Sequence, residues 1–350
     1  MKKYSSILSY FAIDGSIAEV KPLGNGLIND TFLVVTEGDK PDYVLQRINN
    51  AIFQDVEGMQ RNIEAVTGHL RKKLAAKGVD DIDRRVLRFV PDKTTGKTFY
   101  FDGSDYWRVS VFIPRTVTVQ EVNADTARSA GRAFGDFEAM LADLQAPMIE
   151  TIPDFHNMEL RLRQLRDAVA ADPVGRLAAV SDLVEAIEAR ADEMTAAERL
   201  GREGKLHKRL CHCDTKVNNM LLDAATGEVL CVIDLDTVMP SFVFSDYGDF
   251  LRTGACTTAE DEPDTSKIDF DMDIYNAFTE GYLSAATFLT PQERRMLPYA
   301  ARLFPYMQAV RFLADYINGD TYYKTAYPDH NLVRTRAQLA LFAAIDRRLG

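Results

Sequence analysis

The sequence has few cysteines, no long apolar run and no excess of basic residues. Four cysteines among 350 residues do not make a disulfide framework, because disulfide-dependent domains carry them far more densely. The longest apolar stretches, such as Val229–Ile233, are much shorter than the roughly 20 residues that cross a bilayer. Asp14 and Gly15 interrupt the amino-terminal segment, so we expect no signal peptide and a cytoplasmic protein.

The charge balance is acidic, with 41 Lys and Arg against 52 Asp and Glu and a formal net charge of −11. A nucleic-acid-binding surface needs clustered basic residues to replace phosphate counterions, so we expect no nucleic-acid partner. We also expect no membrane association, a small-molecule substrate, and a monomer or weak homodimer. An acidic enzyme still binds ATP, because magnesium and a few local donors meet the phosphates.

The first third of the chain is β-rich. Hydrophobic and β-branched patterns predict strands at Ala18–Leu23, Thr31–Val35, Tyr43–Ile48, Val86–Val90 and Trp107–Phe112. A helix is predicted over Gln54–Lys77, because apolar residues recur there at helical spacing, namely Val56, Met59, Ile63, Val66 and Leu70.

The chain after Pro114 is mainly helical. Helices are predicted at Asp125–Leu144, Met158–Ala170, Val174–Ala191 and from Ile268 to the end, with one β-rich island at Leu210–Ile233. We therefore predict an α+β, protein-kinase-like fold of two lobes. Residues 1–114 are expected to form the nucleotide-binding lobe, and residues 115–350 the catalytic and substrate-binding lobe, with a hinge near Phe112–Arg115.

The segment His212–Asn219 reads H-x-D-x-x-x-x-N, which has the Asp-to-Asn spacing of a kinase catalytic loop. Phosphoryl transfer needs a carboxylate that orients the attacking hydroxyl and accepts its proton. It also needs a neutral oxygen donor that holds Mg²⁺ without quenching that carboxylate. We assign the first role to Asp214 and the second to Asn219. Short patterns of this kind also arise by chance, so the motif needs support elsewhere.

An apolar strand that ends in Asp234, twenty residues after Asp214, gives this support. Such a strand delivers a rigid carboxylate, as the metal-binding aspartate of protein kinases requires. We predict Asp234 as the main Mg²⁺ ligand, and Asp236 as a second ligand or as a tie for the following loop. A zinc site at Cys211–Cys213 is less favoured, because it lacks a second ligand pair at zinc-site spacing.

The nucleotide side of the predicted site is a glycine-containing loop between two strands. Its glycines let backbone N–H groups approach phosphates, and its polar side chains brace the turn. The candidates there are Gly24, Asn25, Gly26, Asn29 and Thr31. An ordinary hairpin is the alternative.

A cation for the phosphates is expected on the third strand, where Arg47 takes the place of the usual lysine. Glu64 is its expected partner, with Glu57 as the alternative, and a solvated surface role for Arg47 is equally compatible with the pattern. Phe112 and Ile113 at the hinge are expected to pair with adenine through their backbone.

These segments resemble the phosphotransferase family that includes aminoglycoside phosphotransferases, choline kinases and homoserine kinases. Within that family the chain is most similar to N-acetylhexosamine 1-kinases. The resembling stretches are Asn25–Thr31, Tyr43–Asn49, Ala133–Phe137, His212–Asn219, Val232–Tyr247 and Arg311–Asp320. The resemblance implies an ATP- and Mg²⁺-dependent transfer to the anomeric hydroxyl of N-acetylglucosamine or N-acetylgalactosamine, in which Asp214 orients or deprotonates that hydroxyl.

Leu27, Phe244 and Arg311 are the predicted substrate contacts beside Asp214. Related sequences often carry histidine where this chain has Leu27. Phe244 belongs to an aromatic-rich stretch that walls a sugar pocket or fills the core. Arg311 lies in an otherwise apolar helix, so it is either salt-bridged or directed at a polar ligand.

Two other readings are compatible with these patterns. One keeps the chemistry but changes the acceptor to an aminoglycoside, a choline-like amine or a hydroxy amino acid. Cationic acceptors need carboxylates, which the acidic runs at 261–264 and 269–273 offer, although such runs are usually solvated. The other is a nucleotide-binding pseudokinase, which the presence of Asp214, Asn219 and Asp234 disfavours.

Overall fold

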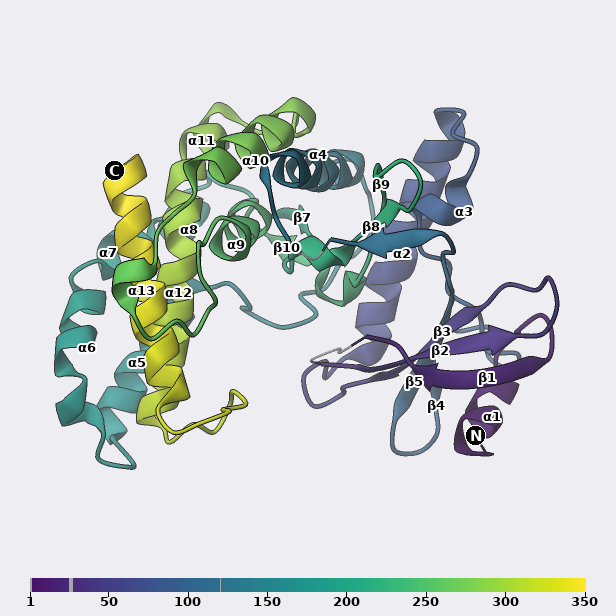
Figure 1. Cartoon of the computed structure of the whole chain (residues 1–350), viewed down its shortest axis with the longest axis horizontal. Coiled ribbons are helices and arrows are strands. Elements are labelled where there is room, and N and C mark those ends of the chain that lie inside the picture. Colours follow the sequence, from purple (N-terminus) through teal and green to yellow (C-terminus); the bar gives the residue numbers. More distant parts are fainter. Residues whose placement is uncertain (1, 25–27, 120) are drawn as a thin grey trace. The chain divides into compact units, whose positions relative to one another are not determined.

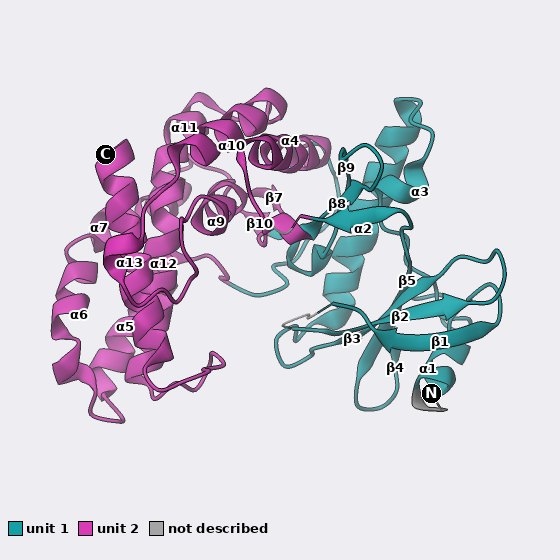
Figure 2. Ribbon diagram, viewed as in Figure 1, with its two compact units in different colours: residues 1–118, 143–153, 219–239 teal, residues 119–142, 154–218, 240–350 magenta. Residues whose placement is uncertain are grey.

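The computed structural model of the protein describes residues 2–24, 28–119 and 121–350. The chain forms two compact units, each made of several stretches (Figure 2). The first unit contains residues 1–118, 143–153 and 219–239, and the second contains residues 119–142, 154–218 and 240–350. The first is β-rich and the second mainly helical, which confirms the predicted α+β class. The units do not coincide with a single division after Pro114, because later stretches of chain return to the first unit.

An antiparallel sheet in the order β1-β2-β3-β5-β4 dominates the first unit (Figure 1). Its strands are β1 (Ile17–Pro22), β2 (Asp30–Thr36), β3 (Tyr43–Ile48), β4 (Tyr100–Phe101) and β5 (Tyr106–Val111). Four of the five predicted strands match these elements within a few residues. The strand predicted at Val86–Val90 is wrong: apart from one bridge at Phe89 this segment is extended chain, because the short helix α3 (Ile82–Arg85) ends directly before it.

The two faces of this sheet have different environments. On one face, a core cluster joins the sheet to the amino-terminal helix α1 (Lys2–Ser9), a helix that the sequence patterns had not indicated. The cluster includes Leu8, Phe11, Tyr43, Leu45, Trp107 and Val109. Side chains alternate between faces along a strand, so Gln46 and Arg108 point to the opposite face. That second face carries buried polar groups.

The helix predicted over Gln54–Lys77 is α2 (Val56–Ala76). Asp55 caps it by accepting the N–H of Gly58 at 2.7 Å, which satisfies one of the free donors of the first turn. The expected apolar positions are all buried. A second, three-stranded sheet of the first unit has the order β6-β8-β9 and consists of β6 (Thr116–Thr118), β8 (Met220–Asp223) and β9 (Val229–Val232). The turn η3 (Leu235–Thr237) follows β9.

The second unit is built from helices around a short strand pair. Its longer helices are α4 (Ala124–Leu141), α5 (Met158–Ala171), α6 (Ser181–Glu188), α9 (Phe244–Gly254), α10 (Met272–Ala285), α12 (Leu297–Ile317) and α13 (His330–Leu349). The short ones are η1 (Leu177–Ala179), α7 (Ala191–Met194), α8 (Ala196–Arg202), η4 (Thr265–Lys267) and α11 (Pro291–Arg295). β7 (Arg209–Cys211) pairs with β10 (Met239–Ser241), and η2 (Val217–Asn219) precedes β8.

The single helix predicted over Val174–Ala191 is wrong. The chain forms η1 and then α6 there, because Asp172 adopts φ 32° and its side chain accepts the N–H groups of Arg176 and Leu177, which gives this segment its own start. In the rest of the unit, α12 packs against α5, α9 and α13, and α4 packs along α10 (Figure 1). Within the described residues, no helix is both long and apolar enough to span a membrane.

Candidate active site

The loop at 212–215 lies in the second unit and is fixed by α9. The buried Asp246 carboxylate accepts the backbone N–H groups of His212 and Cys213, each at 2.7 Å. The backbone N–H of Thr215 donates to Asp249 at 3.1 Å, and its hydroxyl donates to the Asp246 carbonyl at 2.7 Å. Cys213 has φ 62°, a conformation that these bonds enforce. The loop therefore has a rigid, hydrogen-bonded backbone.

His212 supports this loop from inside the core. Its ring is fully buried and packs edge-on against Phe134 and Phe137 of α4. The backbone N–H of Asp214 lies 3.3 Å from its Nδ1, which accepts this bond. His212 thus orients the backbone of Asp214.

Glu138 of α4 lies close to Asp246 in the core of the second unit. Ligand-type atoms of Glu138, Cys211 and Asp246 lie within 4.8 Å of one another, and the Tyr282 hydroxyl donates to Glu138 at 2.5 Å. Burial, together with the neighbouring Asp246 carboxylate, raises the pKa of Glu138 well above its usual range. Burial also raises the pKa of the Cys211 thiol. Both shifts favour the protonated forms of these groups, which suits a structural support.

Asp214, the predicted catalytic carboxylate, forms an ion pair with Lys216 at 2.7 Å. Burial alone lowers the pKa of Lys216, but the carboxylates of Asp214 and Asp249 outweigh it and the pKa of this ammonium is raised. Lys216 therefore stays charged beside Asp214. We did not assign it a role from the sequence, although its position two residues after Asp214 in the loop is a usable signal.

A pocket in the second unit surrounds this ion pair. It is lined by Phe155, His156, Cys213, Asp214, Lys216, Asp249, Arg252, Phe304, Met307, Gln308 and Arg311. Two predicted site residues, Asp214 and Arg311, therefore line one cavity. Phe244 does not: it is buried edge-on against Tyr299, so the core role is the one that the structure supports.

The cations of this pocket differ in how they are paired. Arg252 contacts Asp249 at 3.5 Å and Glu260 at 2.7 Å. Arg311 donates to the side-chain oxygen of Gln308 at 3.1 Å and lies over the rings of Phe155 and Tyr323. No ion pair of Arg311 with a carboxylate occurs among the residues that the structure describes. Its guanidinium is consequently available for a polar ligand.

His156 is held in its neutral form at the pocket wall. Burial, with the nearby guanidinium groups of Arg311, Arg161 and Arg252, lowers its pKa well below the usual value. Its Nδ1 lies 3.0 Å from the Ser245 hydroxyl, and its ring stacks on Phe155. A neutral, wedged imidazole is suited to shaping the pocket.

In the first unit, β8 and β9 bring Asn219 and Asp234 to the same end of a hairpin. Met220 lies opposite Val232, and the Ile233 N–H donates to the Asn219 carbonyl at 2.9 Å. Asp234 follows directly and adopts φ 59°, which turns the chain out of the strand. An amide oxygen and a carboxylate oxygen at this edge fit Mg²⁺, which prefers hard oxygen donors.

Asp236 was predicted as a second Mg²⁺ ligand or as a tie for the loop, and its contacts favour the second role. Its Oδ2 accepts the side-chain N–H of Asn29 at 2.7 Å, and its Oδ1 pairs with Arg108 at 2.5 Å. Both oxygens are engaged within the protein, and the side chain is buried. The alternative prediction, that Asp236 ties down the loop, agrees with this geometry.

The predicted glycine-containing loop of the nucleotide site is described only in part. Asn25, Gly26 and Leu27 lie outside the described residues. Gly24 has φ 69°, and the Leu23 N–H donates to the Thr31 carbonyl at 2.9 Å, which closes the base of the loop. The Thr31 hydroxyl accepts from Gln46 at 3.2 Å.

The contacts of Arg47 and Glu64 differ from the expected pair. Arg47 Nε donates to Asp30 at 2.8 Å, whereas Glu64 accepts from the Thr98 hydroxyl at 2.6 Å. Phe112 donates its N–H to the Asp42 carbonyl, and Ile113 is buried in a small apolar cluster. The Phe112 N–H is thus already used within the unit.

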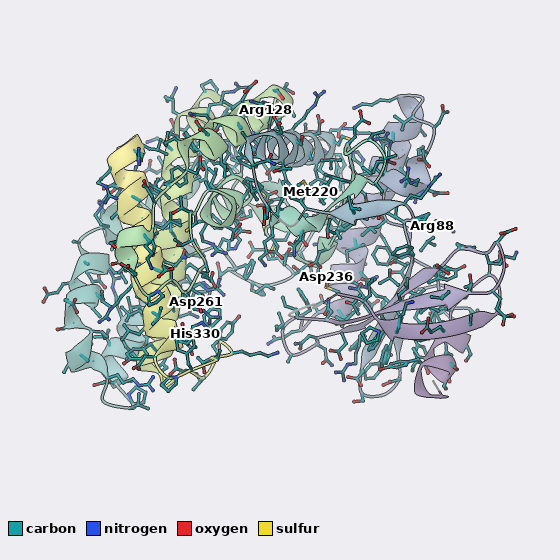
Figure 3. All side chains as sticks on the ribbon, viewed as in Figure 1. Arg88, Arg128, Met220, Asp236, Asp261 and His330 are labelled. Carbon is teal, nitrogen blue, oxygen red and sulfur yellow. The ribbon has the colours of Figure 1, made fainter. Side chains whose placement is uncertain are left out.

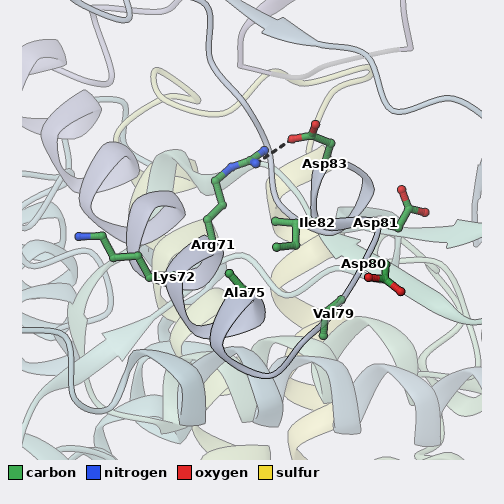
Figure 4. Close-up of a pocket in the computed structure, with 8 residues that line it drawn as sticks. All are labelled: Arg71, Lys72, Ala75, Val79, Asp80, Asp81, Ile82 and Asp83. Atoms are coloured by element: carbon green, nitrogen blue, oxygen red, sulfur yellow. Dashed lines mark hydrogen bonds and ion pairs between the residues drawn. The ribbon is translucent and has the colours of Figure 1, made fainter.

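A separate pocket of the first unit lies beside the end of α2 and around α3 (Figure 4). It is lined by Arg71, Lys72, Ala75, Val79, Asp80, Asp81, Ile82 and Asp83. Arg71 pairs with Asp83 at 2.8 Å across it. None of the predicted site residues lines this pocket, so we assign it no part in the chemistry.

Comparison with known proteins identifies the family. The model of the phosphotransferase enzyme family matches residues 19–286, which is well over half of the chain. The chain belongs to this family. It is therefore a kinase that transfers a phosphoryl group to an alcohol of a small molecule, and ATP with Mg²⁺ is its donor system, as the sequence predicts.

Solved structures share the fold at low sequence identity. A microcompartment-associated aminopropanol kinase is 16% identical, with a TM-score of 0.58, over 99% of this chain and 97% of that one. An aminoglycoside phosphotransferase from Alicyclobacillus acidocaldarius is 15% identical, with a TM-score of 0.61, over 99% and 96%. A spectinomycin phosphotransferase in complex with ADP and spectinomycin is 13% identical, with a TM-score of 0.57, over 98% and 96%. These likenesses confirm the predicted kinase-like fold.

Proposed function

We propose that the chain phosphorylates the anomeric hydroxyl of an N-acetylhexosamine, GlcNAc or GalNAc, and forms the sugar 1-phosphate. This acceptor is more specific than the small-molecule phosphotransferase activity that the family match shows. The observation that carries the proposal is the charge of the pocket around Asp214.

Arg311 makes this pocket unsuited to a cationic acceptor. Its guanidinium and the ammonium of Lys216 line the cavity, and the Asp214 and Asp249 carboxylates are already paired with Lys216 and Arg252. An amine entering the pocket would meet more cationic than free acidic groups. Hydroxyl and acetamido oxygens, in contrast, accept hydrogen bonds from a guanidinium.

The acidic runs that the amine alternative would use have other partners. Asp261 lies 3.2 Å from the ring of His330, at the start of α13 (Figure 3), and Asp269 pairs with Arg348. Asp264 and Asp271 accept backbone N–H groups at the starts of η4 and α10. None of these carboxylates lines the pocket. This distribution favours a neutral sugar over the amine alternatives.

The residues of the chain supply positioning and proton transfer. Asp214 accepts the proton of the attacking hydroxyl, and Lys216 holds that carboxylate in place. Arg311 and His156 orient the sugar at the pocket wall. When bound, MgATP would supply the phosphoryl group, and its Mg²⁺ would offset the negative charge of the phosphates. Asn219 and Asp234 are the residues that would hold the Mg²⁺.

An ADP-release assay with a panel of acceptors tests the proposal. We expect turnover with GlcNAc or GalNAc and little or none with ethanolamine, aminopropanol, choline or spectinomycin. The panel includes these amines because structures similar in fold include an aminopropanol kinase and a spectinomycin phosphotransferase. Phosphorus NMR of the product should show coupling to the anomeric proton.

A matched control is 1-deoxy-N-acetylglucosamine, which lacks only the hydroxyl that is expected to react. It should give no product and should inhibit competitively with the sugar. Phosphorylation of this analogue would place the reaction at another hydroxyl. Activity confined to the amines would reject the sugar proposal and leave the phosphotransferase assignment intact.

A further inference from the structure

Arg108 of β5 is a buried cation in the first unit. It is 2% exposed, and its Nη1 pairs with Asp236 at 2.5 Å, where both side chains are 3% exposed. Its Nε donates to Gln46 at 2.9 Å, and Nη1 also contacts the side-chain oxygen of Gln60 at 3.1 Å. Removing a guanidinium from water is costly, so a buried and multiply bonded arginine of this kind requires a specific reason.

The register of the sheet distinguishes Arg108 from Arg47. Arg47 lies opposite Trp107, and Gln46 lies opposite Arg108. Since Trp107 belongs to the core on the α1 face, Arg47 is on that face too, with its side chain 41% exposed. The face that meets Asp236 therefore presents a neutral Gln46 on β3, and the positive charge comes from the adjacent strand.

A chain formed by an ion pair and hydrogen bonds continues from Arg108 to the glycine-containing loop. Asp236 Oδ2 accepts from the Asn29 amide at 2.7 Å, and Asn29 Oδ1 accepts the backbone N–H of Asn49 at 2.9 Å. Asp236 lies two residues after Asp234 in the turn η3. Arg108, Asp236 and Asn29 thus join the turn after the predicted metal ligand to the loop before β2.

We propose that Arg108 is a positioning residue of the kinase: through Asp236 and Asn29 it fixes the Asp234 turn against the nucleotide loop. Arg108 is paired with Asp236 inside the unit, so its role differs from the phosphate contact that we expected of Arg47 on β3. Gln60 holds the guanidinium from α2 and is itself fixed, because its side-chain amide donates to the Thr98 hydroxyl at 2.8 Å. The proposal depends on the family's phosphoryl-transfer chemistry and is independent of which acceptor is used.

The test compares MgADP binding by calorimetry and the Mg²⁺ concentration that gives half-maximal activity. The double variant R108M/D236N removes both buried charges, so it avoids leaving one of them unpaired. We expect it to fold, to bind MgADP at least tenfold more weakly and to need at least tenfold more Mg²⁺. Arg61→Met on α2, where the arginine side chain is 58% exposed, is the matched control and should stay within threefold of wild type.

Two further variants keep the test decisive if the double variant does not fold. Arg108→Lys retains the charge but loses the fork of donors, and should show a smaller shift in the same direction. Asn29→Ala breaks the chain at its other end while both buried charges stay in place, and should also raise the Mg²⁺ requirement.

Folded variants with wild-type MgADP affinity and Mg²⁺ requirement would overturn the proposal. So would a larger loss of MgADP binding in Arg47→Met than in R108M/D236N, because Arg47 would then be the cation of the nucleotide site. MgADP binding needs no acceptor, so a negative sugar assay would leave this result interpretable.

Discussion

At Asp214, the predicted catalytic carboxylate lies 2.7 Å from the partly exposed ammonium of Lys216. Lys216 fixes the carboxylate oxygen that it touches. The ammonium also interacts with the Asp249 carboxylate, so its attraction is divided between the two aspartates. The loop backbone is held independently by Asp246. A change confined to the Asp214 side chain should therefore affect the chemistry and leave the loop in place.

The variant Asp214→Asn should lower kcat by about 10²–10⁴-fold, the usual contribution of a general base. MgADP affinity should change little, since the amide keeps the volume of the side chain. Stopped assays with the substrate found in the panel, together with calorimetry, would measure both quantities. Asp192→Asn is a suitable control, because that side chain is 98% exposed. Unchanged turnover in Asp214→Asn would refute the role assigned to Asp214.

At the scale of elements, α4 and α10 approach each other through glycines. A Cβ on Gly131 would lie 2.1 Å from the carbonyl oxygen of Phe278, and one on Gly281 would lie 2.0 Å from that of Arg128. These contacts involve backbone atoms, which cannot move aside as a flexible side chain does. Glycine is required here for close helix packing and not for backbone flexibility.

Gly131→Ala and Gly281→Ala should each destabilise the protein by roughly 1–3 kcal/mol or more, because the helices must separate. Gly68→Ala is the matched control. Nothing lies within 4 Å of a Cβ at that position in the middle of α2, so the change should stabilise by roughly 0.5–1 kcal/mol. Urea unfolding followed by circular dichroism would measure these differences. Wild-type stability for both α4–α10 variants would contradict the packing argument.

The elements also show where sequence patterns were sufficient. The helical period from Val56 to Leu70 located α2 within two residues, since one face of that helix is buried along its length. The pattern at Val86–Val90 predicted a strand wrongly, because a short apolar run does not reveal that pairing is limited to Phe89. A helix such as α1, which is covered by only one sheet face, left no pattern that we detected.

At the scale of the whole molecule, buried carboxyl groups make the folding free energy depend on pH. Glu198 of α8 accepts the N–H of Met158 at the start of α5, at 2.6 Å. Burial raises the pKa of Glu198 from 4.5 to about 7, against the opposing effect of that hydrogen bond. Between about pH 4.5 and 7 the folded state keeps a proton that the unfolded state releases. The contribution of Glu198 to the free energy of unfolding therefore falls as the pH rises through that range.

The variant Glu198→Gln should become progressively more stable than wild type from pH 4.5 to about 7. The difference should then stay constant, at up to about 3 kcal/mol. Denaturant titrations at several pH values would follow it. Glu185→Gln, at an exposed position of α6, should show no such trend. A pH-independent difference in Glu198→Gln would indicate that the effect is steric.

The sequence alone predicted the phosphotransferase chemistry from the local spacing of Asp214, Asn219 and Asp234, and the family match confirms that chemistry. It also determined the α+β class from hydrophobic periods. Only the tertiary structure decided which contacts the predicted side chains make. The face of the sheet separates Arg47 from Arg108, burial removes Phe244 from the pocket, and the pairing of Asp236 with Arg108 and Asn29 gives it a structural role. Each of these outcomes depends on partners that are distant in sequence, and no local pattern records them.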